Sequence, residues 1–171
     1  KLHNDASYEV LDALLESEWH EARLCALVIL AERFKKDSET TVKFYLNHMK
    51  GINNWDLVDL SAPYILGVYL LDKKDRQVLY RLAESAVMWE QRVAIVSTLM
   101  LIRNGQFADT IKLAECFLNT KHDLMQKATG WMLREVGKRD EALLVSFLEQ
   151  YKKVMPRTML RYAIEKFSPD Q

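Results

Sequence analysis

Apolar residues recur along the chain at the three- and four-residue spacing that is typical of amphipathic α-helices. No stretch shows the strict alternation of apolar and polar residues that marks a half-buried strand. We therefore predict an all-α protein with about ten helices. The expected helical segments cover residues 7–16, 19–35, 38–49, 55–71, 78–82, 88–102, 107–118, 123–138, 141–151 and 156–167.

Local signals indicate where some of these helices begin or bend. Ser38 is expected to cap the third helix, and Asn53 or Asn54 the fourth, since a short polar side chain can accept from the free N–H groups of a first turn. Pro63 cannot donate a hydrogen bond to the carbonyl of Asp59, four residues earlier. We therefore expect the fourth helix to kink or stop near Asp59.

The helices are arranged in pairs, and the second members of the pairs resemble one another. Arg23, Arg92, Lys127 and Arg161 each precede small or apolar residues, and they are separated by 69, 35 and 34 positions. Halving the first interval gives a period of about 34–35 residues. A helix-pair repeat of this length predicts an α-solenoid of HEAT-like antiparallel helix pairs.

In such a solenoid the second helices line one curved surface, which would present the four basic residues as a cationic stripe. The unit without a basic match is the one that contains Asp59, so the stripe has an acid in its middle. A stripe of this kind can hold a phosphate backbone. The alternative, that these are ordinary solvated charges at helix starts, remains open at this point.

Composition limits the partners that overall charge could select. The 171 residues contain 24 Lys and Arg and 24 Asp and Glu, so any affinity for nucleic acid must come from where the cations lie. Two cysteines in helical patterns suit a reducing cytosol and support neither a disulfide framework nor a zinc cluster. No apolar run is long enough to span a membrane. We expect no metal site, because the four histidines share no ligand spacing.

The strongest candidate for chemistry is the start of the fourth helix. Trp55 and Asp59 are four residues apart and share a helix face. Asp56 lies in the first turn, where its carboxylate meets free N–H groups and the helix dipole, so it has a structural role. Asp59 has no such role. Taken alone, Trp55 could still be a core residue and Asp59 a member of a buried ion pair.

A second tryptophan lies among cations further along the chain. Trp131 is four residues after Lys127 and three before Arg134, so the three side chains can form one ridge. An indole between cations suits a surface that packs against flat or sugar-like groups, although Trp131 could equally be a core residue.

Three segments in this chain resemble the motifs of the AlkD-like DNA alkylation repair proteins, which are HEAT-like-repeat DNA glycosylases. They are Asn54-Trp55-Asp56-Leu57-Val58-Asp59 with Ser61-Ala62-Pro63, Trp89-Glu90-Gln91-Arg92-Val93-Ala94-Ile95, and Gln126-Lys127-Ala128-Thr129-Gly130-Trp131-Met132-Leu133-Arg134-Glu135. They occur in the order and with the spacing of that family, and the resemblance extends from about Ser17 to the C-terminus.

The resemblance implies a concave helical surface that binds duplex DNA. It assigns Asp59 as the catalytic carboxylate and places Trp55 and Trp131 against the deoxyribose of the damaged nucleotide. It further implies that Arg92 holds a backbone phosphate near the lesion, with Lys127 and Arg134 as additional phosphate contacts.

The resemblance also implies the substrate, which is a cationic alkylated purine of the N3-methyladenine or N7-methylguanine type. Alkylation makes the base a good leaving group, so the chemical task is to stabilise an oxocarbenium-like sugar. A carboxylate near C1′ does this without a cofactor, and no deep base pocket is required. Two alternatives remain: a non-catalytic HEAT-repeat binder of distorted or branched DNA, and a protein-interaction scaffold.

The family has an additional N-terminal helical region, and this chain begins at Lys1 without a Met. We therefore expect residues 1–171 to form a single domain that lacks an N-terminal helical segment. We also expect a monomer that acts in the cytoplasm on chromosomal DNA.

Overall fold

The computed structural model describes residues 5–167, in which the regular secondary structure is all helical and no strand occurs. The predicted all-α class is confirmed. The α-helices are α1 (Tyr8–Leu15), α2 (His20–Arg33), α3 (Ser38–Asn47), α4 (Trp55–Ser61), α5 (Gln77–Ala83), α6 (Met88–Arg103), α7 (Ala108–Cys116), α8 (Asp123–Gly137), α9 (Glu141–Tyr151) and α10 (Arg157–Ala163). A short 3₁₀ helix, η1 (Met49–Gly51), precedes α4, and a π-helix, η2 (Pro63–Gly67), follows it.

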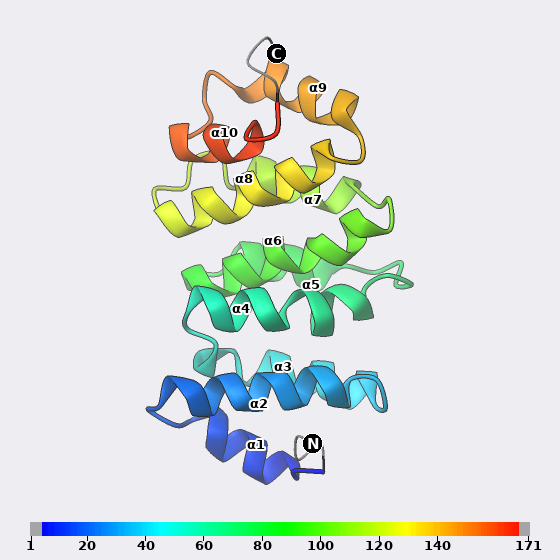
Figure 1. Cartoon of the computed structure of the whole chain (residues 1–171), viewed down its shortest axis with the longest axis vertical. Coiled ribbons are helices and arrows are strands. Elements are labelled where there is room, and N and C mark those ends of the chain that lie inside the picture. Colours follow the sequence, from blue (N-terminus) through cyan, green and yellow to red (C-terminus); the bar gives the residue numbers. More distant parts are fainter. Residues whose placement is uncertain (1–4, 168–171) are drawn as a thin grey trace.

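The helices lie across the long axis of the molecule and follow one another along it (Figure 1). The even-numbered helices α2, α4, α6, α8 and α10 form a row in which each packs against the next. All five begin at the same edge of the molecule, on the left in Figure 1, and α3, α5 and α7 lie behind them. The row therefore brings the N-terminal halves of sequence-distant helices to one edge.

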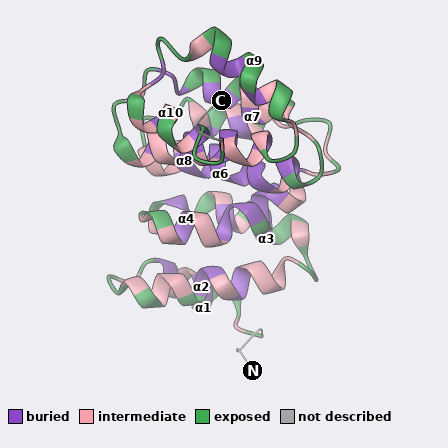
Figure 2. Cartoon of the chain, turned by 45° about the horizontal axis from the view of Figure 1, so that its top comes forward, coloured by how far each residue is buried: buried purple, intermediate pink, exposed green. Residues whose placement is uncertain are grey.

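One continuous apolar core runs between the two sets of helices (Figure 2). The helix α6 lies at its centre and contacts α4, η2, α5, α7 and α8. Every residue of α6 from Arg92 to Leu99 is buried. A helix that is surrounded in this way needs small or apolar residues on all sides, and the run Val93-Ala94-Ile95-Val96 supplies them. The buried centre of the molecule therefore fixes the position of Arg92.

The starts of two helices test the capping predictions. Asn54 is the N-cap of α4, and its side chain accepts from the N–H of Trp55 at 2.7 Å. The cap of α3 is Asp37, whose carboxylate accepts from the N–H of Thr40 at 3.2 Å, and Ser38 is the first helical residue. The predicted Ser38 cap is wrong by one position, because two adjacent residues both have good capping side chains.

The predicted interruption at Pro63 is confirmed. The helix α4 ends at Ser61, and the chain continues through η2, in which the N–H of Gly67 donates to the carbonyl of Ala62, five residues earlier, at 2.9 Å. A π turn of this kind accommodates a residue that lacks an N–H donor. Gly67 packs so closely on α6 that a Cβ there would collide with the carbonyl oxygen of Ser97.

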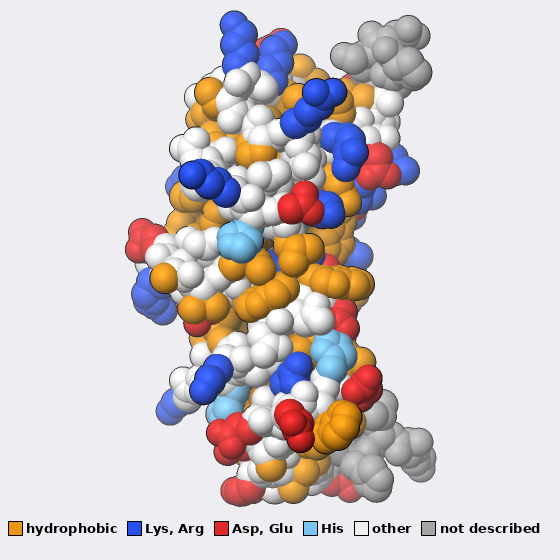
Figure 3. Space-filling model, turned by 90° about the vertical axis from the view of Figure 1, so that its left-hand side faces the viewer, with side chains coloured by type: hydrophobic (Ala, Val, Ile, Leu, Met, Phe, Trp, Pro, Cys, Tyr) orange, Lys and Arg blue, Asp and Glu red, His pale blue; other side chains and the backbone are white. Residues whose placement is uncertain are grey.

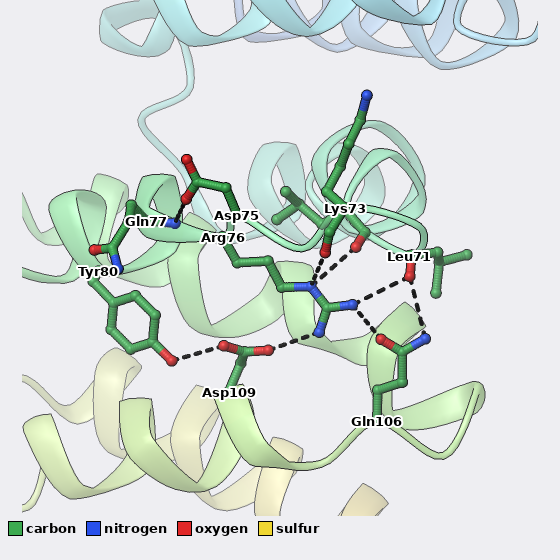
Figure 4. A network of polar contacts seen from close by, with 9 residues as sticks. Leu71, Lys73, Asp75, Arg76, Gln77, Tyr80, Gln106 and Asp109 are labelled. Atoms are coloured by element: carbon green, nitrogen blue, oxygen red, sulfur yellow. Dashed lines mark hydrogen bonds and ion pairs between the residues drawn. The ribbon is translucent and has the colours of Figure 1, made fainter.

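A partly buried arginine, Arg76, holds the connection between η2 and α5 (Figure 4). Arg76 donates from Nη1 to Asp109 at 2.8 Å, and its Nε donates to the carbonyls of Leu70 and Lys73 at 3.0 and 3.2 Å. Tyr80 donates to the other oxygen of Asp109 at 2.7 Å. Burial and the carboxylate of Asp109 raise the pKa of the Tyr80 phenol, so Tyr80 stays protonated. This network links the connection between η2 and α5 to the first turn of α7.

Candidate functional site

A cavity of about 370 Å³ opens among α4, α6, α8 and α10. All six residues that the sequence singled out as catalytic or DNA-binding line it. The complete lining consists of Trp55, Asp59, Arg92, Leu124, Lys127, Ala128, Trp131, Arg134 and Tyr162. The row of parallel helices thus brings residues of four helices to one site.

The two tryptophans contribute different surfaces to this cavity. Trp55 is the first residue of α4 and is 53% exposed, so it is not a core residue. Trp131, in the middle of α8, is partly buried against the core and presents its remaining surface to the cavity. One indole is therefore largely free and the other is fixed by packing.

The central polar contact joins Asp59 of α4 to Arg92 of α6. Arg92 donates from Nε to Oδ1 at 3.0 Å and from Nη2 to Oδ2 at 2.8 Å, which is the two-bond geometry that arginine and carboxylate favour. Its Nη1 donates to the carbonyl of Leu124 at 2.5 Å and so links α6 to α8. Arg92 is only 5% exposed.

The ion pair determines how accessible Asp59 is and which groups Arg92 contacts. The Asp59 side chain is 20% exposed and lines the cavity, so the carboxylate is paired with an arginine but is not sealed from solvent. Arg92 was expected to hold a phosphate, yet here it is nearly buried and holds Asp59 and the α8 backbone instead. The phosphate contact of Arg92 remains a prediction.

The surroundings of Asp59 disfavour its ionised form. Burial raises the pKa of Asp59 above its usual range, although the hydrogen bonds and positive charge of Arg92 act in the opposite direction, and the nearby Asp56 raises it further. The charge is thus held where water screens it only partly. A charge in such a place acts more strongly on a neighbouring group than a charge in bulk water.

The remaining cations surround the cavity, and each has an acidic partner. Lys127 lies 2.5 Å from Asp123, one helical turn earlier, and this contact raises the pKa of the lysine. Arg134 pairs with Glu165, and its Nε is buried with no hydrogen-bond partner among the described residues. Lys127 is the more exposed of the two side chains.

The expected cationic stripe is uneven. Arg161 is exposed on α10, with its guanidinium 5.9 Å from the centre of the Tyr162 ring. Arg23, in contrast, donates to the carbonyls of Ser17 and Glu18, in the loop before α2, and does not line the cavity. The stripe therefore continues from the cavity toward α10 but not toward α2.

Tyr162 is a site residue that the sequence analysis missed. It lies on α10 and lines the cavity beside Trp131. Gly130 makes this possible, because a Cβ at that position would lie 2.5 Å from the carbonyl oxygen of Met159 and 2.6 Å from the Cβ of Tyr162. The available signal was that Tyr162 directly follows Arg161, which the repeat alignment had singled out.

Asp56 has the structural role expected of it. Its Oδ1 accepts from the N–H of Leu57 at 2.8 Å, within the first turn of α4. Its Oδ2 lies 2.7 Å from Nε2 of His20, at the start of α2. This second contact, which the sequence did not suggest, joins the N-terminal ends of two neighbouring helices.

Residues 5–167 offer neither a metal-binding cluster nor a membrane-spanning helix. No three His, Cys, Asp or Glu side chains in this part of the chain lie close enough to hold a metal ion. No helix in the same part is both long enough and apolar enough to cross a membrane.

The family model for the DNA alkylation repair enzyme family matches residues 1–167, which is nearly the whole chain. The comparison with curated protein sequences found no match.

Proposed function

Because this chain belongs to the DNA alkylation repair enzyme family, we propose that it is a DNA glycosylase built as a HEAT-like α-solenoid. It hydrolyses the N-glycosidic bond of cationic alkylated purines, of the N3-methyladenine and N7-methylguanine type, in duplex DNA. The observation that carries the proposal is the position of Asp59, whose carboxylate faces an open cavity together with two indoles.

Contacts between helix pairs support the solenoid. Several side-chain contacts join residues that are about one repeat apart. They link His20 to Asp56, Asp59 to Arg92, Arg76 to Asp109 and Tyr151 to Glu115, at separations of 36, 33, 33 and 36 residues. These values bracket the period of about 34–35 that the basic residues predict. Equivalent positions in successive units therefore meet, as a solenoid requires.

The proposed chemistry depends on charge that develops on the sugar. As the bond to the alkylated base breaks, positive charge builds at C1′, and a carboxylate beside it lowers the energy of that state. The partial burial of Asp59 strengthens this attraction. Arg92 fixes both oxygens of the carboxylate, so little reorganisation is needed during the reaction.

The two indoles complete the environment of the sugar. An aromatic face carries a negative quadrupole, which attracts a cationic ring that packs against it. Trp55 has the exposed surface for this contact, and Trp131 forms the opposite part of the cavity lining. They also exclude bulk water from the cation, apart from the water that attacks it.

Substrate selection follows from the shape of the cavity. At about 370 Å³ and open on one side, it admits a deoxyribose with its flanking phosphates more readily than a base buried on all sides. A site without a base-reading pocket selects by how easily the base leaves. Positively charged purines leave readily and neutral ones do not, so lesion charge determines the choice.

The test is release of methylated purine from alkylated duplex DNA by the wild type and by Asp59→Asn. We expect the rate to fall by about 100-fold or more, because an amide cannot supply the negative charge. DNA affinity should largely persist, since the cations around the cavity are unchanged. Thermal unfolding of Asp59→Asn corrects the rate for the folded fraction, and an undiminished rate would exclude this mechanism.

The pairing of Asp59 also favours a second candidate function. A carboxylate that receives two hydrogen bonds from a buried arginine can be a purely structural ion pair. The protein would then bind damaged or distorted duplex without cutting the glycosidic bond. This candidate predicts salt-sensitive DNA binding with no released base, so the same assay separates the two functions.

A further inference from the structure

Charge is distributed unequally along the long axis of the molecule. Residues 5–59 contain six Lys and Arg and eleven Asp and Glu, whereas residues 120–167 contain ten and six. The intervening residues, 60–119, are nearly balanced, with seven and six. Figure 3, which views the edge where the even-numbered helices begin, shows Lys and Arg gathered toward the C-terminal end and Asp and Glu toward the N-terminal end.

The cations at the C-terminal end are available for binding. Arg157 and Arg161 are exposed on α10, and Lys121 is exposed just before α8. None of these three pairs with a carboxylate within residues 5–167. The two arginines lie on the same helix as Tyr162, which lines the cavity. An open basic surface therefore continues directly from the cavity.

The opposite side of the cavity has the reverse character. The next helix in the row, α2, begins at the same edge as α4, to which the His20–Asp56 contact joins it. Glu16 and Glu18 in the preceding loop and Glu21 in the first turn of α2 are exposed. A phosphate backbone that continued past Trp55 in this direction would meet these carboxylates.

We propose that the protein binds its duplex asymmetrically. The DNA is held on one side of the lesion only, along α8 and α10, and is repelled on the other side by the acidic start of α2. This inference rests on the proposed function for the position of the lesion at the cavity. Adjacent packed helices are about 8–10 Å apart, so the row from α4 to α10, which includes the cavity itself, spans roughly eight base pairs.

The experiment compares two duplexes of about 14 base pairs that differ only in the position of one 7-methylguanine. The modified nucleotide lies about four base pairs from one end or from the other. We expect the dissociation constants, measured at low salt, to differ by at least about tenfold, because only one duplex can place its long arm on the basic surface. Equal dissociation constants, or no binding of either duplex, would overturn the proposal.

Charge-reversal variants identify the two surfaces. Arg157→Glu with Arg161→Glu should weaken binding of the favoured duplex at least about tenfold. The slope of log affinity against log salt should fall by the equivalent of about one to two phosphate contacts. The matched control, Lys36→Glu with Lys43→Glu, removes two exposed cations from the acidic end and should change affinity less than about twofold. Equal losses in both variants would contradict a localised surface.

A third variant tests the repulsion itself. Glu18→Lys with Glu21→Lys converts the acidic start of α2 into a basic one, so the disfavoured duplex should gain affinity until the two duplexes bind alike. If the difference between them persists, the carboxylates do not cause it.

Base release from the same two duplexes separates this inference from the proposed function. Unequal affinities without any released 7-methylguanine would refute the glycosylase and leave asymmetric binding standing. Release at equal rates and with equal affinities would refute asymmetric binding and leave the glycosylase standing.

Discussion

Two arginine–aspartate pairs, Arg92–Asp59 and Arg76–Asp109, use the same chemistry in different surroundings. Each joins residues 33 positions apart, and each includes a nitrogen–oxygen contact of 2.8 Å. In the second pair, Arg76 reaches only one oxygen of the aspartate, and the phenol of Tyr80 occupies the other. In the first pair, one arginine holds both oxygens, and the remaining surface of the aspartate faces the cavity.

The difference shows how to distinguish a structural ion pair from one that belongs to a functional site. Around Asp109 both oxygens are occupied, by Arg76 and Tyr80 at the start of α5, and Arg76 also holds the carbonyls of the connection between η2 and α5. Asp59 takes both of its donors from one side, so the acid is oriented but still accessible. Burial also raises the pKa of Asp59, a perturbation that is frequent at functional sites.

The largest expected effect comes from breaking each pair at its arginine. Arg76→Ala should lower the free energy of unfolding by about 3 kcal/mol, because it leaves Asp109 without its ion-pair partner and frees the connection before α5. The rate of base release per folded molecule should stay unchanged. Urea denaturation and the methylpurine assay measure the two quantities.

Arg92→Ala is the matched variant on the other pair. It should also destabilise the fold, but in addition it should weaken both base release and DNA affinity, because Asp59 loses its orientation and the cavity loses a cation. If the two arginine variants lowered the corrected release rate equally, the distinction between the pairs would be wrong.

A smaller effect is expected from Gly130→Ala, which changes the cavity and leaves both pairs in place. The new methyl group would collide with Met159 and Tyr162, so α10 must move away from α8. We expect base release to fall by about tenfold, with a stability loss of about 1–3 kcal/mol. Gly137→Ala is a control in the same helix, since its Cβ would meet only the side chain of Leu144. A release rate equal to that of the control would show that the position of Tyr162 does not matter.

The mildest perturbation is pH, which titrates Asp59 without changing the sequence. Because the pKa of Asp59 is raised, base release should decline with falling pH at a value above about 4, the ordinary range of an aspartate. The free energy of unfolding changes with pH in the opposite direction to the rate of base release. A raised carboxyl pKa in the folded state means that Asp59 destabilises the fold more as pH rises through that pKa. A rate profile with its midpoint at or below about 4, after subtraction of spontaneous depurination, would contradict the assignment.

Much of the helical fold could be predicted from the sequence. Apolar spacing predicted ten helical segments, and Pro63 predicted the interruption after α4, because both are local properties of the chain. The cap of α3 was misplaced by one residue, since Asp37 and Ser38 are equally suited to the position. The π geometry of η2 could not be predicted, because it depends on how closely Gly67 approaches α6.

The site was predictable in its membership but not in its contacts. Trp55, Asp59, Arg92, Lys127, Trp131 and Arg134 were all singled out, and all line one cavity. An ion pair at Asp59 was one of the alternatives left open, but its partner Arg92 could not be specified, because the pairing depends on how α6 lies against α4. Tyr162 was missed for a similar reason, since only the close approach of α10 at Gly130 brings it to the cavity.

The π turn at Pro63–Gly67 has a consequence for how this unit tolerates changes in length. In an uninterrupted α-helix, one inserted residue rotates every later side chain by about 100° and would carry the downstream half away from its packing partners. A wider turn absorbs the extra residue locally. The half that bears Trp55 and Asp59 is therefore insulated from insertions and deletions beyond Pro63, so the η2–α5 connection can diverge while the site keeps its alignment.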